Sequence, residues 1–226
     1  MGIISTKGFC YRGVPVDLAR SIINESEVNT FIETGTHWGN TAIWAAQFFD
    51  KVITIEASQT IFDNNNFNQY KNINALFGSS ASVLPEIMAD NSIIYLDAHF
   101  SGGDTFNDFP LLEELKIINS YSYNNVTIII DDARYCMALW NDDSYGSLDD
   151  IIYLMSKNKA RKVVIIDDMI IAVPMNLKHI IDEYTNRISK KYFNQFIEDS
   201  AKISRNNSPI KKILEKGYSK IRRLYK

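Results

Sequence analysis

The sequence predicts an α/β fold whose sheet is doubly wound, mostly parallel and closed by an antiparallel hairpin. Short β-branched runs alternate with helical patterns from residue 30 to residue 132, and such alternation favours parallel strands joined by helical crossovers. A glycine-containing turn joins the first predicted strand to its helix. Two apolar runs, 162–166 and 169–173, flank Asp167-Asp168, which is typical of a hairpin. Together these features predict a Rossmann-like sheet.

The individual elements follow one another in chain order. We expect strands around Phe31 and Ile32 and at 52–55, 73–77, 91–97 and 125–132, because each is a short apolar run between polar turns. We expect helices at 16–28, directly after Gly39, and at 59–70, 82–88, 110–118 and 148–155. Ser147 and Asp150 have the spacing of a capping box at the start of the last of these helices.

A single catalytic domain is expected over residues 1–175, with residues 1–27 as a segment that covers the ligand. Residues 176–226 are polar and helical in propensity, with a break near 206–209, and are expected to form a helical, basic extension. Residues 201–226 contain nine Lys or Arg and one Glu, whereas the rest of the chain contains 15 basic and 26 acidic residues. A basic tail suits nucleic acid, an anionic membrane or an acidic partner.

Packing of that tail on the chain's own acidic body explains the same charges, and we favour it, expecting no nucleic-acid partner. The sequence is also compatible with a homo-oligomer in which the tail forms contacts between subunits. No stretch reaches the ~18 apolar residues of a membrane span, and no signal peptide is evident. The two cysteines lack metal-site spacing and are expected to be reduced. We therefore expect a cytoplasmic protein without a membrane span.

The segment from Glu33 to Gly39 (ETGTHWG) contains the glycine turn. Glycine lets a backbone turn sharply and pass close to a ligand. The next strand ends in Glu56, where a carboxylate can accept both hydroxyls of a ribose. An acid before the first glycine suits a cationic ligand better than a pyrophosphate. The pattern resembles motif I of class I S-adenosylmethionine (SAM) methyltransferases.

That resemblance implies a set of cofactor-binding residues at the carboxyl ends of the first four strands. Ser79 and Ser80 follow the third strand and are expected near the adenine, and Asp97 follows the fourth. The predicted cofactor-binding residues are Glu33, Thr34, Gly35, Thr36, Gly39, Glu56, Ala57, Ser79, Ser80 and Asp97.

Three carboxylates, Asp97 again among them, follow the fourth and fifth predicted strands. Asp97, Asp131 and Asp132 are expected at one edge of the sheet, where they repel one another unless a positive charge lies between them. Oxygen ligands favour Mg²⁺ or a similar hard cation. Each aspartate can instead cap the helix that follows its strand.

The motifs YLDAHFSGGDT, PLLEEL and IIIDDAR resemble those of small metal-dependent O-methyltransferases of the macrocin O-methyltransferase type, over about residues 28–173. The resemblance implies a Mg²⁺ site at Asp97, Asp131 and Asp132. Where that family has a second aspartate as general base, this sequence has His99, which leaves the base role open although histidine is suited to it. The implied reaction is methylation of a hydroxyl on a sugar or similar small polar acceptor, with nucleotide-linked sugars and surface-polysaccharide synthesis as the setting.

Two alternatives stay open. One keeps SAM but makes the metal incidental, with a phosphate-type oxygen or a nitrogen as acceptor; the other is a nucleotide-binding protein without catalysis. Several side chains also have two interpretations. His37 and Trp38 either touch the cofactor or pack beneath the loop, and Arg134 either meets an anionic substrate or offsets nearby acids. We expect Asp167-Asp168 to be only a turn, and 113–114 to be a solvated helix face.

Overall fold

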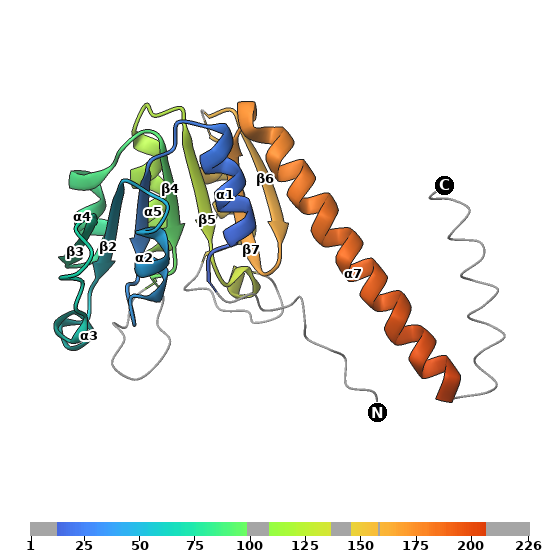
Figure 1. Cartoon of the computed structure of the whole chain (residues 1–226). Coiled ribbons are helices and arrows are strands. Elements are labelled where there is room, and N and C mark those ends of the chain that lie inside the picture. Colours follow the sequence, from blue (N-terminus) through green and yellow to red (C-terminus); the bar gives the residue numbers. More distant parts are fainter. Residues whose placement is uncertain (1–12, 99–108, 137–145, 158, 207–226) are drawn as a thin grey trace. The chain divides into compact units, whose positions relative to one another are not determined.

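The computed structural model describes residues 13–98, 109–136, 146–157 and 159–206. The chain divides into two compact units after Asp182. The first unit contains a seven-stranded sheet (Figure 1), and the long helix α7 (Lys178–Asn206) begins in this unit and continues into the second. None of the helices in these ranges is both long enough and apolar enough to span a membrane.

The sheet has the strand order β3-β2-β1-β4-β5-β7-β6. β1 to β5 pair in parallel, whereas β7 runs antiparallel to both β5 and β6. This confirms the predicted parallel sheet closed by a hairpin. The strands are β1 (Thr30–Thr34), β2 (Lys51–Glu56), β3 (Ile73–Phe77), β4 (Ser92–Leu96), β5 (Val126–Ile130), β6 (Arg161–Ile166) and β7 (Met169–Pro174).

The order places a topological switch between β1 and β4. From β1 the chain builds outward to β3 and then returns to add β4 on the other side of β1. The crossovers on either side diverge there, so ligands of such sheets bind at the carboxyl ends of these strands. The candidate site therefore belongs at the ends of β1, β2, β4 and β5.

Helices cover both faces of the sheet. α4, α5 and α6 lie side by side on one face, while α1 and α2 lie on the other (Figure 1). The helices of the first unit besides α7 are α1 (Val16–Glu25), α2 (Asn40–Ala45), α3 (Gln59–Asn64), α4 (Ser80–Ile87), α5 (Leu111–Ser120) and α6 (Leu148–Ser156).

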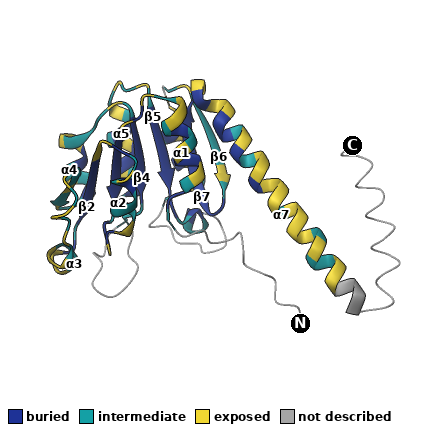
Figure 2. Ribbon diagram, viewed as in Figure 1, coloured by how far each residue is buried: buried dark blue, intermediate teal, exposed yellow. Residues whose placement is uncertain are grey.

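The parallel strands at the centre are buried throughout, as their β-branched runs predict (Figure 2). Alternate side chains face opposite layers. Ile32, Ile94 and Ile128 join the core formed with α4, α5 and α6. Phe31 and Tyr95 face the other layer, where the Phe31 ring contacts Phe49 and Trp44.

Most predicted helices have the expected position but different ends in the structure. The helix expected to reach residue 70 ends at Asn64, because Asn65 is extended and its side chain donates to the carbonyl of Ile61 at 3.0 Å. The helix expected at 82–88 runs from Ser80 to Ile87, and the one expected to reach residue 28 ends at Glu25. The cap at Ser147 is confirmed, since its hydroxyl accepts from the Asp150 amide at 3.1 Å.

Candidate functional site

The loop from Thr34 to Gly39 packs tightly against its neighbours at the carboxyl edge of the sheet. Gly35 has a φ of +85°, and a Cβ there would lie 2.6 Å from the carbonyl oxygen of Asp97. Gly39 has a φ of +70°, and a Cβ there would lie 2.6 Å from the Phe67 ring. Both positions therefore require glycine for backbone conformation and for packing within the protein. The close approach of a ligand to these two glycines stays a prediction.

Glu56 connects this loop to the end of β2. Its carboxylate accepts a hydrogen bond from the His37 amide at 3.0 Å and another from the Ser58 amide at 2.9 Å. The residue is buried, with Ala57 partly exposed beside it. Two backbone donors thus hold the carboxylate in one orientation at the strand end where the sequence predicts ribose recognition.

Glu33 lies beneath the loop rather than on its surface. The Thr54 hydroxyl donates to Glu33 at 2.6 Å and lies 2.6 Å from the hydroxyl of Thr36. Glu33 is only 2% exposed, and burial raises its pKa to about 8, with Asp97 contributing repulsion and hydrogen bonds from Thr54 and Thr41 opposing the shift. Thr34 is also buried, and its carbonyl accepts from the Asp97 amide at 3.1 Å.

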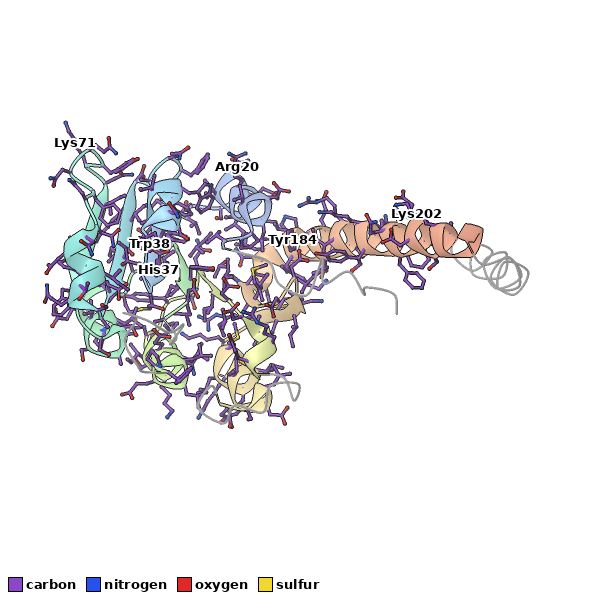
Figure 3. All side chains as sticks on the ribbon, turned by 90° about the horizontal axis from the view of Figure 1, so that it is seen from below. Arg20, His37, Trp38, Lys71, Tyr184 and Lys202 are labelled. Carbon is purple, nitrogen blue, oxygen red and sulfur yellow. The ribbon has the colours of Figure 1, made fainter. Side chains whose placement is uncertain are left out.

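Asn65 supports the loop from α3, which the sequence analysis missed. Its side-chain amide donates to the carbonyl of His37 at 2.7 Å. The adjacent Trp38 is 69% exposed, and its ring meets the His37 ring edge-on at 5.0 Å. Figure 3 labels His37 and Trp38, the two aromatic residues of the glycine loop. The exposure of Trp38 rules out packing beneath the loop.

Ser79 and Ser80 lie where β3 passes into α4. Ser79 is the N-terminal cap residue, and its carbonyl accepts from the amides of Ser82 and Val83 at 3.0 Å each. The Ser80 hydroxyl is buried and has no hydrogen-bond partner among the described residues. A buried hydroxyl without a partner is costly, so this atom fits the polar contact predicted for the adenine.

A small hollow, with room for about one water-sized group, lies at the ends of β4 and β5. Asp131 is held at its edge by the hydroxyl of Tyr95, which donates to one carboxylate oxygen, and by the amide of Asp132, which donates to the other at 2.8 Å. Burial raises the pKa of Asp131 to about 7, and repulsion from Asp97 adds to the shift. The lining residues are Leu96, Asp97, Ala98, Phe109, Leu111, Glu114, Ile130 and Asp131.

Glu114 corrects the prediction that both glutamates of this helix face solvent. Glu113 is exposed, but Glu114 is only 1% exposed and lines the hollow. It lies three residues after Leu111 and directly before Leu115, both buried, so helical spacing places it on the inward stripe. The helical spacing of the apolar residues indicated this burial, but the adjacent charge of Glu113 suggested a solvated face instead.

Asp132 points to Arg134, not to the hollow. An Arg134 guanidinium nitrogen lies 2.5 Å from Asp132 and also forms an ion pair with Asp168. Asp167 and Asp168 form a turn, as predicted, but both are buried, and Asp168 is a partner of Arg134. Burial alone would lower the pKa of Arg134, but Asp132 and Asp168 outweigh it and raise that pKa further. Arg134 therefore offsets local acids, one of its two predicted roles.

The predicted Mg²⁺ site does not fit this arrangement. Asp132 is paired with Arg134 and does not line the hollow, which leaves Asp97 and Asp131 as two of the three predicted ligands. Across the described ranges, no three His, Cys, Asp or Glu residues are grouped so that they could hold a metal ion. His99 lies outside the described residues. We assign no chemical step to a metal.

Comparisons with known proteins concern the fold. No family model matches the chain, and no curated protein matches it. Cofactor-bound Rv0187 from MTB superposes with a TM-score of 0.54 at 13% identity, over 72% of this chain and 81% of its own. The likeness is one of fold.

Two further solved structures have the same fold and hold SAH. SMU.1697c from Streptococcus mutans superposes with a TM-score of 0.50 at 10% identity, over 72% of this chain and 99% of its own. The Podospora anserina methyltransferase PaMTH1 has a TM-score of 0.50 at 14% identity, over 71% of this chain and 79% of its own. This chain therefore has the Rossmann-like fold found in these proteins.

Proposed function

We propose that this protein is a SAM-dependent methyltransferase acting on a hydroxyl of a small polar acceptor, such as a free or nucleotide-linked sugar. The observation that carries the proposal is the Glu56 carboxylate at the end of β2, held by the amides of His37 and Ser58. Each carboxylate oxygen can accept more than one hydrogen bond, so capacity remains for both ribose hydroxyls.

The surrounding residues supply the rest of the proposed cofactor site. The loop of Thr34, Gly35, Thr36 and Gly39 offers its backbone to the aminoacyl end of SAM, and Glu33 supports it from beneath through Thr54. Further contacts are assigned to Ala57 beside the ribose, to Ser79 and Ser80 at the adenine, and to Asp97 at the end of β4. Support also comes from SMU.1697c and PaMTH1, whose structures hold SAH, the product that remains when SAM loses its methyl group.

The acceptor is proposed to bind at the ends of β4 and β5, with its reacting hydroxyl at the small hollow there. Asp97 and Asp131 line it, and carboxylates accept hydrogen bonds from hydroxyl groups. Bound SAM would supply the methyl group to the acceptor oxygen and leave as SAH, and the hydroxyl proton would pass to a base. Alignment of oxygen, carbon and sulfur supplies much of the rate. The predicted base is His99, and near-native turnover by His99→Ala would remove it from that role.

A titration of the purified full chain with SAM, SAH and NAD tests the cofactor class. We expect saturable one-site binding of SAM and SAH and none of NAD, because the loop keeps only Gly35 and Gly39 and lacks the G-x-G-x-x-G spacing that places a pyrophosphate on a helix N-terminus. Methyl-labelled SAM offered with sugars, nucleotide sugars, phosphates and amines then identifies the acceptor class. Binding of NAD without SAM would refute the proposal, and labelling of amines alone would refute the hydroxyl acceptor.

A further inference from the structure

The guanidinium of Arg134 lies among the carboxylates that follow β5. One of its nitrogens is 2.5 Å from Asp132 and also pairs with Asp168. The side chain of Asp168 is 1% exposed, that of Asp132 14% and that of Arg134 17%. This cation is therefore largely withdrawn from solvent and has a carboxylate partner on each of two segments.

The β6–β7 turn fixes this arrangement from a distant part of the chain. The Arg134 amide donates to the Asp168 carboxylate at 2.9 Å, across 34 residues. The Ala133 amide donates to the Asp168 carbonyl at 2.7 Å. Asp132 and Asp168 also have φ values of 58° and 63°, which non-glycine residues adopt only where surrounding contacts hold them. The guanidinium is thus anchored by backbone and side-chain bonds at once.

This anchoring changes what the acids at the strand ends can bind. Mg²⁺ needs near-octahedral oxygen ligands at short range, and Asp132 already interacts with a guanidinium that stays charged at all ordinary pH values. Only Asp97 and Asp131 of the predicted triad line the hollow. A divalent ion approaching Asp132 would also meet the positive charge of Arg134.

We propose that Arg134 takes the place of the divalent cation, as a built-in counter-charge for the acids after β5, so that these carboxylates do not form a metal site. Asp168 is the positioning residue that holds Arg134 there. The inference is separate from the proposed methyl transfer, because metal binding can be measured without SAM or an acceptor. If the chain bound neither SAM nor a metal ion, the proposed function would be refuted and this inference would still hold.

Mn²⁺ tests the proposal, since it takes oxygen ligands as Mg²⁺ does and can be counted directly by electron paramagnetic resonance. We expect no saturable binding of Mn²⁺ to the full-length wild-type chain. Arg134→Gln removes the positive charge beside Asp132 and should gain one saturable Mn²⁺ site at concentrations where the wild type shows none, because like charges at this range repel strongly. The matched control Arg134→Lys keeps the charge and should gain no site.

Two results would overturn the proposal. One is stoichiometric Mn²⁺ binding by the wild-type chain that Asp132→Asn abolishes; the other is a folded Arg134→Gln variant that gains no Mn²⁺ site. If Arg134→Gln does not fold, the melting temperature of the wild-type chain decides. A ligand that binds only the native state raises that temperature, so we expect no change with added Mn²⁺, and a saturable rise would contradict us.

Discussion

The two halves of the carboxyl edge satisfy their acids in different ways. At the ends of β1 and β2, the partners of Glu33 and Glu56 come from the same strand–helix–strand unit, in Thr54, His37 and Ser58. At the ends of β4 and β5, nearby contacts such as the Asp132 amide on Asp131 are joined by partners from farther away. Tyr95, 36 residues earlier, binds Asp131, and Asp168, 34 residues later, binds Arg134.

The difference separates a locally encoded site from one that depends on the whole sheet. In the first half, hydroxyl and amide donors hold Glu33 and Glu56, and no cation is among their hydrogen-bond partners in the described part of the chain. The second half brings a guanidinium from beyond the strand to offset two acids. Changes in the first half should therefore act on ligand binding and proton uptake, and changes in the second on stability.

Glu33→Gln tests the half at the ends of β1 and β2, where the acids have partners in the same strand–helix–strand unit. It has the largest expected effect. The folded pKa of about 8 lies above the unfolded value of 4.5, so the native state keeps the proton that the unfolded state loses. This stabilisation is complete below pH 4.5 and is lost as the pH rises through about 8. Glu33 alone should lower the wild-type free energy of unfolding across that window by about 5 kcal/mol.

Glutamine stays neutral and retains an acceptor for Thr54, so the variant should lose the part of the pH dependence that Glu33 contributes. The part that comes from Asp131, whose pKa is raised to about 7, should persist, so the two chains should differ most clearly between about pH 7 and 8. Urea unfolding at several pH values measures both chains. Parallel pH profiles for wild type and Glu33→Gln would show that this carboxyl does not carry the effect.

Asp168→Ala tests the long-range half. The change leaves a largely buried guanidinium with one carboxylate and removes the acceptor for the Arg134 amide. We expect a loss of about 3 kcal/mol in the free energy of unfolding, the lower range for breaking a buried ion pair. Urea denaturation measures it, and the exposed Glu113→Ala serves as a control with little change. Equal stability of the two variants would mean that the turn does not hold the loop after β5.

Glu56→Ala should act on ligand affinity. Loss of hydrogen bonds from ribose to a charged group should weaken SAM binding by roughly 1.5–3 kcal/mol. The His37 and Ser58 amides also lose their acceptor, so circular dichroism should first establish that the variant is folded. Calorimetric titration measures the change. Unchanged SAM affinity in a folded Glu56→Ala chain would exclude the proposed ribose contact.

The smallest effect is expected from removing residues after Ser200. The proposed cofactor residues belong to the first unit, which ends at Asp182, so the affinity for SAM should stay within experimental error. The full-length chain, titrated side by side, is the control. A soluble chain ending at Ser200 that no longer bound SAM would show that the basic extension contributes to the site.

The sequence by itself determined the elements and most of their order. β-branched runs defined the central strands, and the acid, two glycines and Glu56 identified the strand–helix–strand unit, because these signals depend on neighbours a few residues apart. Helix ends were less certain: Asn65 ends α3 early through a bond to Ile61 and also reaches His37. Hydrogen bonds from one short polar side chain to two segments do not change the hydrophobic periodicity, so the sequence pattern does not predict them.

Only the tertiary structure decided which charges meet. Glu114 and Asp168 looked like a solvated helix face and a simple turn, yet one lines the hollow and the other anchors Arg134. The three aspartates suggested a metal triad because parallel strand ends converge, but Asp132 lies beside a guanidinium held by a turn 34 residues away. The free energy of a charge depends on what surrounds it in space, and a linear sequence does not specify those surroundings until the sheet is assembled.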